Sequence, residues 1–528
     1  MLKADKTTFS LILFLTVIGA FVRLYAPLSA IMPINDGGLF YVMIQDIRTN
    51  YYSLPLVTTY NQANIPFAYP PLAFYLYALT ADVTKIPLLD LMRVLPAIIS
   101  SLTIPAFYLL AKEILGSKPS VFLAVFGFAL LPRTYDWIIM GGGVTRALGF
   151  LFALLALRQT YRLFANGSRA DIFPVIALSS LVVYSHPEAI VHTIIGSAFF
   201  YLWKDRSRRG FAYALVVAIG VCLITAPWWW TVESRHGVSS LVAPLTAVRQ
   251  DNISMLNRFF SLFQFQFSDE PFLNIFGILG LLGLFFLLAN KQYFIPTWLV
   301  TAYLIEPRSA PLYIMAPLAM AFGAGLDKFI LPGLRGHDLR QVPDTKNDAD
   351  IWTDQLLEGR AVKIFIGFIF VYGLISNIYL ASQSLTRFIL TRQDLDAFQW
   401  ARDDAPANSQ FILIAQENPL LDPSSDWFPA LTGQKSIATV YGYEWVNDGL
   451  FGTRLDQARA LQICAVMDIS CIKMWQTDTG KEYSHIYIRK IKNGAPVQVP
   501  LVKYLEFSSE HEKVYETDSV VVFRKNNP

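Results

Sequence analysis

Long apolar runs, separated by short polar connections, occupy the first three quarters of the chain. A helix that crosses a bilayer needs roughly 20 mostly apolar residues. Several runs reach that length and others are shorter, and together they predict an α-helical polytopic membrane protein with about eleven spans. The predicted spans lie near 9–27, 88–111, 118–132, 146–163, 171–186, 188–203, 210–230, 271–289, 292–306, 309–330 and 361–384.

Two segments complicate this count. The first run could be a cleaved signal peptide, because Lys3 and Lys6 precede it. It is long, no small-x-small cleavage site follows it and further spans come later, so we predict a retained helix. The aromatic stretch 67–85 is interpreted as a helix that lies at the external surface or dips partway into the bilayer. A full span there would invert the charge bias of the later loops.

Beyond about residue 387 the apolar runs become short and are divided by polar turns. Such runs are typical of strands, which we predict at 411–415, 471–475, 485–491, 501–507 and 519–524. The stretch 455–467 has the periodicity of an amphipathic helix. We therefore predict a membrane domain over 1–386, with a long external loop at 28–87, and a C-terminal α/β domain over 387–528.

The composition agrees with a membrane protein. Charged residues make up 16% of the chain, below the roughly 25% of soluble domains, and the mean hydropathy is +0.40. The net charge is only +3, which gives no electrostatic footprint for nucleic acid. The expected partner is therefore the lipid bilayer and not a nucleic acid.

The basic residues of the connecting loops predict the orientation. Lys and Arg favour cytoplasmic loops, and the segment 204–210 (KDRSRRG) is the strongest single indication. These residues fall on the cytoplasmic side if the N-terminus is cytoplasmic. With eleven spans, the C-terminal domain then lies on the extracytoplasmic side of a multi-pass protein of the cell membrane. There, Cys464 and Cys471 could form a disulfide bond.

The external loops hold the residues with candidate chemistry. Ionisable groups at membrane depth are costly and usually carry function or are paired. Asp36 follows the first span and precedes Gly37 and Gly38. Its carboxylate could act as a general base on a hydroxyl or as a ligand to a divalent cation. The alternative is that Asp36 caps the helix that follows it.

The second external loop, 131–146 (LPRTYDWIIMGGGVTR), combines a glycine triplet with Arg133, Asp136 and Arg146. Glycine-rich backbone beside an arginine can cradle a phosphate, although the spacing matches no phosphate-loop pattern. The alternative is a glycine hinge with an interfacial tryptophan.

The third loop holds His186, Glu188 and His192. Glu188 precedes His192 by four residues, so on a helix the two could share a metal or form a hydrogen-bonded pair. A histidine at a helix end is more often structural. A fourth loop, near 231–270, contains an apolar periodic stretch at 238–263 that predicts an amphipathic helix on the membrane surface.

The fifth external turn, 304–320, carries Glu306 and Arg308. An arginine at headgroup level is well placed to bind a lipid phosphate, because its guanidinium matches phosphate geometry. The alternative is a salt bridge between Arg308 and Glu306, or anchoring to lipid headgroups.

The order of these features resembles the GT-C superfamily of membrane glycosyltransferases, which includes protein O-mannosyltransferases, aminoarabinose transferases and oligosaccharyltransferase catalytic subunits. The resemblance covers most of the chain. It rests on the early loop acid Asp36, the segment FAYPPLAFYLY, the span RVLPAIISSLTIPAFYLLAKEILG, the span ending in LPR, and the tail phrase DWFPALTGQKSIATVYGYEW at 426–445.

The resemblance implies transfer of a sugar from a polyprenyl-phosphate-linked donor on the extracytoplasmic face. It implies a base or metal-ligand role for Asp36 and donor-phosphate binding by Arg308, with Arg133 and Arg146 as further candidates. A divalent metal, Mg²⁺ or Mn²⁺, is a possible cofactor. The second loop has no acid pair and the tail has no Trp-Trp-Asp motif, which argues against N-glycosylation. The sugar and the acceptor stay open.

Two other functions stay open at this stage. A transporter or flippase for lipid-linked sugars usually shows internal repeats and broken helices near the midplane, and no repeat is visible. A polymerase or ligase of surface polysaccharide shares the polyprenyl donor and the many spans. The long tail and the early loop acid favour the transferase over it.

Overall fold

The computed structural model describes residues 6–141, 143–247, 275–335, 359–416, 418–446 and 448–526. Within these ranges a helix lies at each of the predicted spans. The helices are α1 (Lys6–Ser29), α4 (Leu88–Ile114), α5 (Lys118–Leu130), α6 (Gly143–Asn166), α7 (Ile172–Val183), α8 (Pro187–Lys204), α9 (Arg208–His236), α12 (Ile275–Ala289), α13 (Phe294–Ile305), α14 (Ala310–Tyr313) with α15 (Met315–Gly325), the π-helix η4 (Leu326–Ile330) and α16 (Leu331–Leu334), and α18 (Arg360–Arg387).

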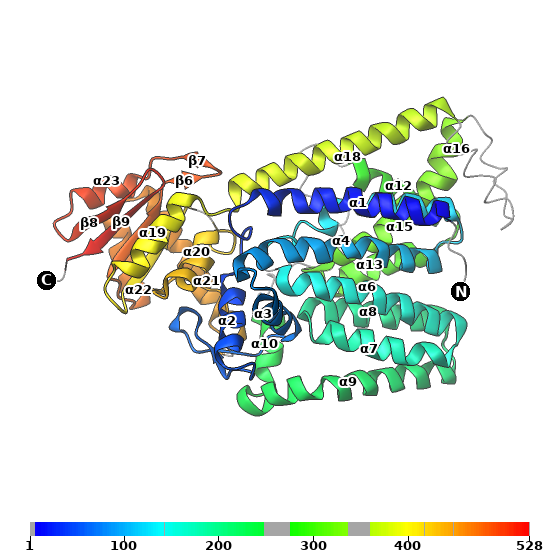
Figure 1. Cartoon of the computed structure of the whole chain (residues 1–528), viewed down its shortest axis with the longest axis horizontal. Coiled ribbons are helices and arrows are strands. Elements are labelled where there is room, and N and C mark those ends of the chain that lie inside the picture. The colour runs from blue at the N-terminus through cyan, green and yellow to red at the C-terminus, as the bar shows by residue number, and fades with distance from the viewer. Residues whose placement is uncertain are drawn as a thin grey trace.

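These apolar helices form the bundle of a multi-pass membrane protein (Figure 1). Six helical stretches in the described ranges are long and apolar enough to cross a membrane: α1, α4, α6, α9, the run from α14 to α16, and α18 with its continuation to Asp403. The helices α5, α12 and α13 are apolar but have 13, 15 and 12 residues. The number of spans therefore stays a prediction.

Small residues let neighbouring helices approach closely. A Cβ atom added to Gly283 of α12 would lie 2.0 Å from the carbonyl oxygen of Ala321 on α15. Lipid tails give no hydrophobic drive for helices to associate, so packing at small residues is a main source of stability in such bundles.

A buried arginine joins three helices. Arg23 of α1 is fully buried, and it donates hydrogen bonds to the carbonyl oxygen of Ala129 (2.7 Å), to Thr134 Oγ1 (2.9 Å) and to Ser100 Oγ (3.2 Å). Its guanidinium also lies 4.6 Å from the ring centre of Tyr135. A cation at this depth persists only when its donors are satisfied, so Arg23 fixes the start of the second loop.

The first loop and one short helix lie between the bundle and the C-terminal sheet (Figure 1). The loop contains α2 (Gly38–Thr49), the antiparallel pair β1 (Val57–Thr58) and β2 (Ile65–Pro66), the 3₁₀ turn η1 (Tyr60–Gln62) and α3 (Leu72–Thr84). The helix predicted within 67–85 is α3, which has 13 residues. The short helix α10 (Ser239–Ala247) completes this layer.

The C-terminal part contains a mixed five-stranded sheet in the order β4-β3-β5-β9-β8. The central strand β3 is parallel to β4 and β5, and β9 is antiparallel to β5 and β8. The strands are β3 (Gln410–Ile414), β4 (Lys435–Ser436), β5 (His485–Arg489), β8 (His511–Glu516) and β9 (Val520–Lys525), with a separate hairpin of β6 (Ile491–Lys492) and β7 (Ala495–Pro496). The helices are α19 (Arg392–Asp403), α20 (Pro423–Thr432), α21 (Phe451–Ile463), α22 (Ile469–Thr479) and α23 (Pro500–Glu506), with 3₁₀ turns η6 (Tyr443–Trp445) and η7 (Cys464–Val466).

Two of the predicted strands are wrong. The segment 471–475 lies in α22 and the segment 501–507 lies almost wholly in α23. Local helix-start signals outweigh their apolar runs: Asp468 caps α22 by accepting the N–H of Ser470 at 2.8 Å, and Pro500 occupies the first turn of α23. The strands predicted at 411–415, 485–491 and 519–524 correspond to β3, β5 and β9, and the helix predicted at 455–467 corresponds to α21.

Cys464 and Cys471 form a disulfide bond that joins the end of α21 to α22, with Cα atoms 5.5 Å apart. Most of the predicted surface helix at 238–263 lies outside the described residues, and its first part is α10.

Candidate active site

The predicted external loops meet at the end of the bundle that carries the C-terminal sheet. The loop after α1 accepts a hydrogen bond from the second loop, where the N–H of Gly141 bonds the carbonyl oxygen of Ile34 (2.8 Å). A Cβ atom added to Gly141 would lie 1.7 Å from the carbonyl oxygen of Asp36. Only glycine fits at this position, so the predicted glycine-rich loop and the predicted acid are in direct backbone contact.

Asp36 lies immediately before α2, and its Oδ2 is 3.5 Å from Nη2 of Arg146. Arg146 occupies the first turn of α6. Its Nη1 donates to the carbonyl oxygen of Trp137 (3.0 Å), and its guanidinium lies 5.7 Å from the centre of the Trp137 ring. The two residues predicted separately as acid and phosphate ligand therefore form an ion pair, and the backbone of the second loop fixes the arginine.

The alternative role of Asp36 as the helix cap is wrong, because Asp426 of α20 supplies the cap. Asp426 Oδ2 accepts the backbone N–H of Gly37 (2.7 Å) and of Gly38 (2.8 Å), and Oδ1 accepts that of Leu39 (3.1 Å). Tyr60 donates its hydroxyl to Oδ1 at 2.8 Å. An acid from the C-terminal part thus binds the exposed N–H groups of α2, where the helix dipole favours a negative charge.

The contact between Asp426 and the start of α2 leaves no room for a side chain at position 38. A Cβ atom added to Gly38 would lie 2.3 Å from the carbonyl oxygen of Asp426. The neighbouring Trp427 donates its ring N–H to the carbonyl oxygen of Asn35 at 2.9 Å. Burial and the nearby charge of Asp36 raise the pKa of Asp426 to about 6, against the opposing effect of its hydrogen bonds to Gly37, Tyr60 and Gly38.

The third loop lies on the other side of Arg146. His186 places Nε2 3.3 Å from Glu188 Oε2, and its Nδ1 lies 2.8 Å from the hydroxyl of Tyr69. Glu188 also lies within electrostatic reach of Arg146. The segment FAYPP therefore contributes Tyr69 to the site, a residue that the spacing of charged groups does not reveal.

Glu188 and His192 do not form the predicted pair. Glu188 lies in the first turn of α8, where it meets His186 and, at 3.8 Å, Nε of Arg308. His192 lies 3.0 Å from Glu306 and 3.0 Å from Ser309 Oγ. The spacing of four residues places Glu188 and His192 on the same helix, α8. Each side chain nevertheless meets a different loop, so tertiary contacts and not the helical spacing determine their partners.

Arg308 has a different salt-bridge partner from the one considered above. Its guanidinium is nearest to Glu188, and Nη1 donates to the carbonyl oxygen of Pro244 at 3.3 Å. Glu306 instead accepts the backbone N–H groups of Arg308 and Ser309. The side chain of Arg308 is 41% exposed, so it could still reach a ligand.

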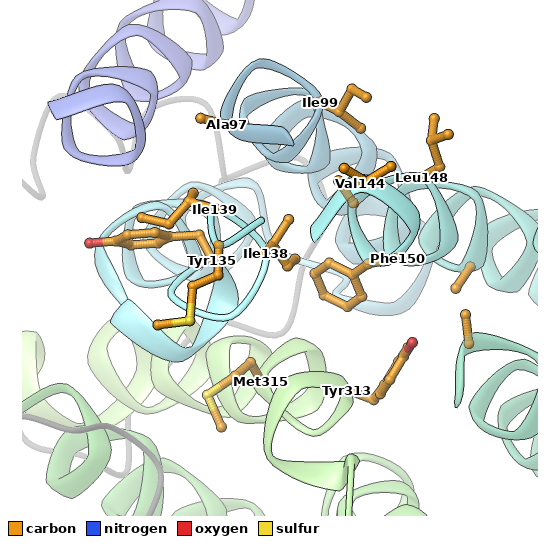
Figure 2. Close-up of a cluster of buried hydrophobic side chains, with 14 of the residues drawn as sticks. Ala97, Ile99, Tyr135, Ile138, Ile139, Val144, Leu148, Phe150, Tyr313 and Met315 are labelled. Atoms are coloured by element: carbon orange, nitrogen blue, oxygen red, sulfur yellow. The ribbon is translucent and has the colours of Figure 1, made fainter. Parts of the chain in front are cut away.

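The charged groups form a row in which the sign alternates: Asp36, Arg146, Glu188 and Arg308. Figure 2 shows a layer of buried apolar side chains that includes Tyr313 and Phe150. In this layer Tyr313, whose ring stacks on His192 at 4.2 Å, meets Phe150 edge-on at 5.5 Å. A rigid apolar support keeps the polar groups in place and lowers the local dielectric.

Arg133 and Asp136 occupy a separate position. Arg133 Nη1 lies 3.6 Å from Asp136 Oδ2, and Asp136 borders a small cavity together with Ile34 and with Ser384 of α18. We leave this pair out of the charged row.

The C-terminal part adds a second acid that the sequence did not single out. Glu444 lies in η6, and burial raises its pKa to about 7, while hydrogen bonds to backbone N–H groups and the charge of Arg308 act in the opposite direction. Its neighbour Trp445 packs on Tyr69 with ring centres 4.9 Å apart. Asp426 and Glu444 both fall in the tail phrase 426–445, which is the signal that could have identified them.

The donor set of the site does not fit a multidentate metal centre. In the ranges that the structure describes, no group of three or more His, Cys, Asp and Glu residues could hold a metal ion. The carboxylates of the row face arginines or histidines, and the cationic groups that a phosphate could meet are Arg146 and Arg308.

No known family model matches the chain, and no curated protein matches its sequence. Solved structures are similar in fold. ArnT from Cupriavidus metallidurans bound to undecaprenyl phosphate aligns with a TM-score of 0.51 and 11% identity over 98% of both chains. The apo state of the same protein gives 0.50 and 10% over the same shares.

A variant of the arabinofuranosyltransferase AftD from Mycobacteria aligns with a TM-score of 0.50 and 14% identity over 98% of this chain and 41% of that one. This chain therefore has the fold of ArnT and of the part of AftD that aligns with it.

Proposed function

We propose that the protein is a membrane glycosyltransferase that moves a sugar from a polyprenyl-phosphate-linked donor to an acceptor on the extracytoplasmic face. The observation that carries this proposal is the ion pair of Asp36 and Arg146, next to the start of α2 that Asp426 of the C-terminal part binds. The GT-C fold supports the reaction class, and the undecaprenyl phosphate bound to ArnT supports the type of donor.

In the proposed step, an acceptor hydroxyl attacks the anomeric carbon of the donor sugar. The bond between that carbon and the phosphate oxygen breaks, and polyprenyl phosphate leaves with the electron pair. The hydroxyl proton passes to the carboxylate of Asp36, which acts as general base. One direct displacement inverts the anomeric configuration.

The two arginines have separate parts in this proposal. Arg308 is partly exposed and binds the phosphate of the incoming donor, whereas Arg146 is held by Trp137 and stabilises the charge that develops on the leaving phosphate. Cations that are already oriented cost little reorganisation when charge develops, which is the usual source of large catalytic effects. No step passes through a metal ion.

The proposal places the protein in the cell membrane with a cytoplasmic N-terminus and an extracytoplasmic C-terminal domain over 387–528. The disulfide of Cys464 and Cys471 supports this orientation, because structural disulfides persist outside the reducing cytoplasm.

The test is Asp36→Asn in the full-length protein, assayed in membranes for release of polyprenyl phosphate and for a sugar-bearing acceptor. We expect a loss of at least 10²-fold, in the range of a removed general base. The matched control is Asp82→Asn on the neighbouring helix α3, which removes a carboxylate that pairs with Arg48 of α2. Full transfer by the Asp36 variant would exclude the proposed base, and movement of donor across the bilayer without release of polyprenyl phosphate would indicate a flippase.

A further inference from the structure

A second polar cavity lies at the opposite end of the bundle, away from the C-terminal sheet. It has a volume of about 150 Å³ and is bordered by the ends of α4, α8 and α12, by the starts of α5 and α13, and by η4. In Figure 1 these ends lie on the same side as the N-terminus. Its polar lining consists of Lys204, Lys328, Gln292 and Ser120.

The ammonium group of Lys204 is held by aromatic rings. It lies 4.9 Å from the ring centre of Tyr161 and 5.0 Å from that of Phe294, both of which border the cavity. Such contacts orient a cation without neutralising it. In the part of the chain that the structure describes, Lys204 makes no salt bridge, so its full charge is available at the cavity.

Lys328 is presented by an unusual backbone. It lies in the π-helix η4, a conformation that is rare and often found at functional sites. The preceding residue, Asp327, is buried, and its Oδ2 accepts hydrogen bonds from Ser117 (2.7 Å) and Ser120 (2.5 Å). One oxygen of this neighbouring acid is thus bound by two hydroxyl groups, and among the described residues Lys328 makes no salt bridge.

Aromatic side chains near the cavity indicate its level relative to the bilayer. Trp203 is 40% exposed and packs edge-on against Phe294 at 5.7 Å, and Tyr293 is 48% exposed. Exposed Trp and Tyr gather at the headgroup level of a bilayer. The rest of the lining is mostly apolar, with Ile114 and Leu287 among it.

We propose that this cavity binds the phosphate of an anionic lipid headgroup in the adjacent leaflet, with the lipid backbone against the apolar wall. Two unpaired cations in a pocket between membrane helices are the pattern that binds acidic lipid headgroups. A free phosphate would satisfy the same cations, but it would leave the apolar wall without a partner. This site lies at the other end of the bundle and does not depend on the proposed transferase activity.

The test measures dissociation constants for phosphatidylglycerol by native mass spectrometry of the detergent-solubilised full chain. We expect binding at least 10-fold tighter than that of phosphatidylcholine, and a loss of about 10-fold in Lys204→Gln/Lys328→Gln. The control Lys291→Gln/Lys363→Gln removes the same charge from exposed positions near that end and should bind as the wild type does.

A second variant places a larger side chain at the border of the cavity and leaves the charges unchanged. A Cβ atom added to Gly116, which borders the cavity, meets nothing within 4 Å, so Gly116→Leu should fold and should weaken lipid binding as the lysine variant does. Equal affinity in the wild type and the lysine variant would overturn the proposal and would mean that the lysines only reach the aqueous interface. Complete displacement of the lipid by millimolar inorganic phosphate would contradict the proposed lipid ligand and would indicate that the site binds free phosphate.

Discussion

The carboxylate of Asp426 accepts the backbone N–H of Gly38 at 2.8 Å, across 388 positions of sequence. Gly38 lies two residues after Asp36, the proposed base. The same carboxylate also bonds Gly37 and Leu39, so the entire start of α2 is held from the C-terminal part. The position of Asp36, the proposed base, is therefore set by Asp426, which lies on α20 in the C-terminal part.

The substitution Asp426→Ala should lower kcat by roughly 10²-fold and change the KM for the donor little. Displacing a reacting group by about 1 Å costs on that order, whereas the partly exposed Arg308 would still bind the donor phosphate. The measurement is steady-state release of polyprenyl phosphate at several donor concentrations.

Two further variants separate this positioning role from general destabilisation. Gly38→Ala disturbs the contact from the other side, because its Cβ would lie 2.3 Å from the Asp426 carbonyl oxygen, and it should give the same kcat loss. Asp448→Ala removes an exposed acid that pairs with Arg454, and it should retain activity. A rise in KM with unchanged kcat in the Asp426 variant would contradict the role.

Activity and stability should respond to pH in opposite directions through Asp426. Its pKa is raised from 3.8 to about 6. Below pH 6 the carboxyl group becomes protonated and neutral, so it binds the amides of Gly37 and Gly38 more weakly, and activity should fall as the pH drops through about 6. Asp36, Tyr60 and Glu444 lie within electrostatic reach of this carboxyl.

The stability follows from proton linkage. Because the folded state holds this proton up to a higher pH than the unfolded state, the contribution of Asp426 is fully present below about pH 4 and is lost as the pH rises through about 6. The difference amounts to about 3 kcal/mol from the size of the shift. Thermal unfolding of the wild type and of Asp426→Asn at pH 4.5 and 7 measures it, and a pH-independent difference between the two would refute the assignment.

Arg308→Ala should raise the KM for the donor by about 10- to 100-fold, which is the range for a lost charged hydrogen bond. Arg308→Lys should recover part of the loss, because the charge returns without the planar fork. The matched control is Arg235→Ala at the same end of the bundle, where the arginine donates to the carbonyl oxygen of Leu54. Equal KM values in the Arg308 and Arg235 variants would speak against donor binding by Arg308.

Treatment with EDTA should leave the transferase activity unchanged. Arg146 and Arg308 supply the positive charge at the site, and the described residues include no cluster of three metal-binding side chains. The experiment compares activity before and after chelation and after addition of Mg²⁺ or Mn²⁺. Activity that disappears with EDTA and returns with either ion would show that a metal takes part.

Counting thiols tests the orientation. The chain has three cysteines, and only Cys222 is free among them. Alkylation of the denatured protein without reduction should label one cysteine, and alkylation after reduction should label all three. Three reactive thiols without reduction would place the C-terminal domain in a reducing compartment and would invert the proposed topology.

Much of the bundle was predictable because its apolar runs are long, and a helix is the only open-ended structure that satisfies its own backbone in lipid. Short apolar runs in the C-terminal part carry less information. The runs at 471–475 and 501–507 suit a strand or a helix equally by periodicity, and the decisive signals were the cap at Asp468 and the proline at position 500.

The candidate site was predictable residue by residue but not in its pairing. Asp36, Arg146, Glu188 and Arg308 were recognised as polar groups at the ends of spans, yet no local pattern links positions from four different loops. Asp426 was missed because it resembles an ordinary acid at a helix start, and only tertiary structure brings it to α2.

The cap of α2 by Asp426 also has a consequence for biogenesis. The chain is made from the N-terminus, so the loop that holds Asp36 is delivered long before the segment that completes it, which comes 389 positions after Gly37. A partly synthesised protein would carry Asp36, Arg146 and Arg308 but would lack the contact that holds the start of α2. Under the proposed function, the transferase would thus stay inactive during its own insertion and gain activity only when the last quarter of the chain has folded.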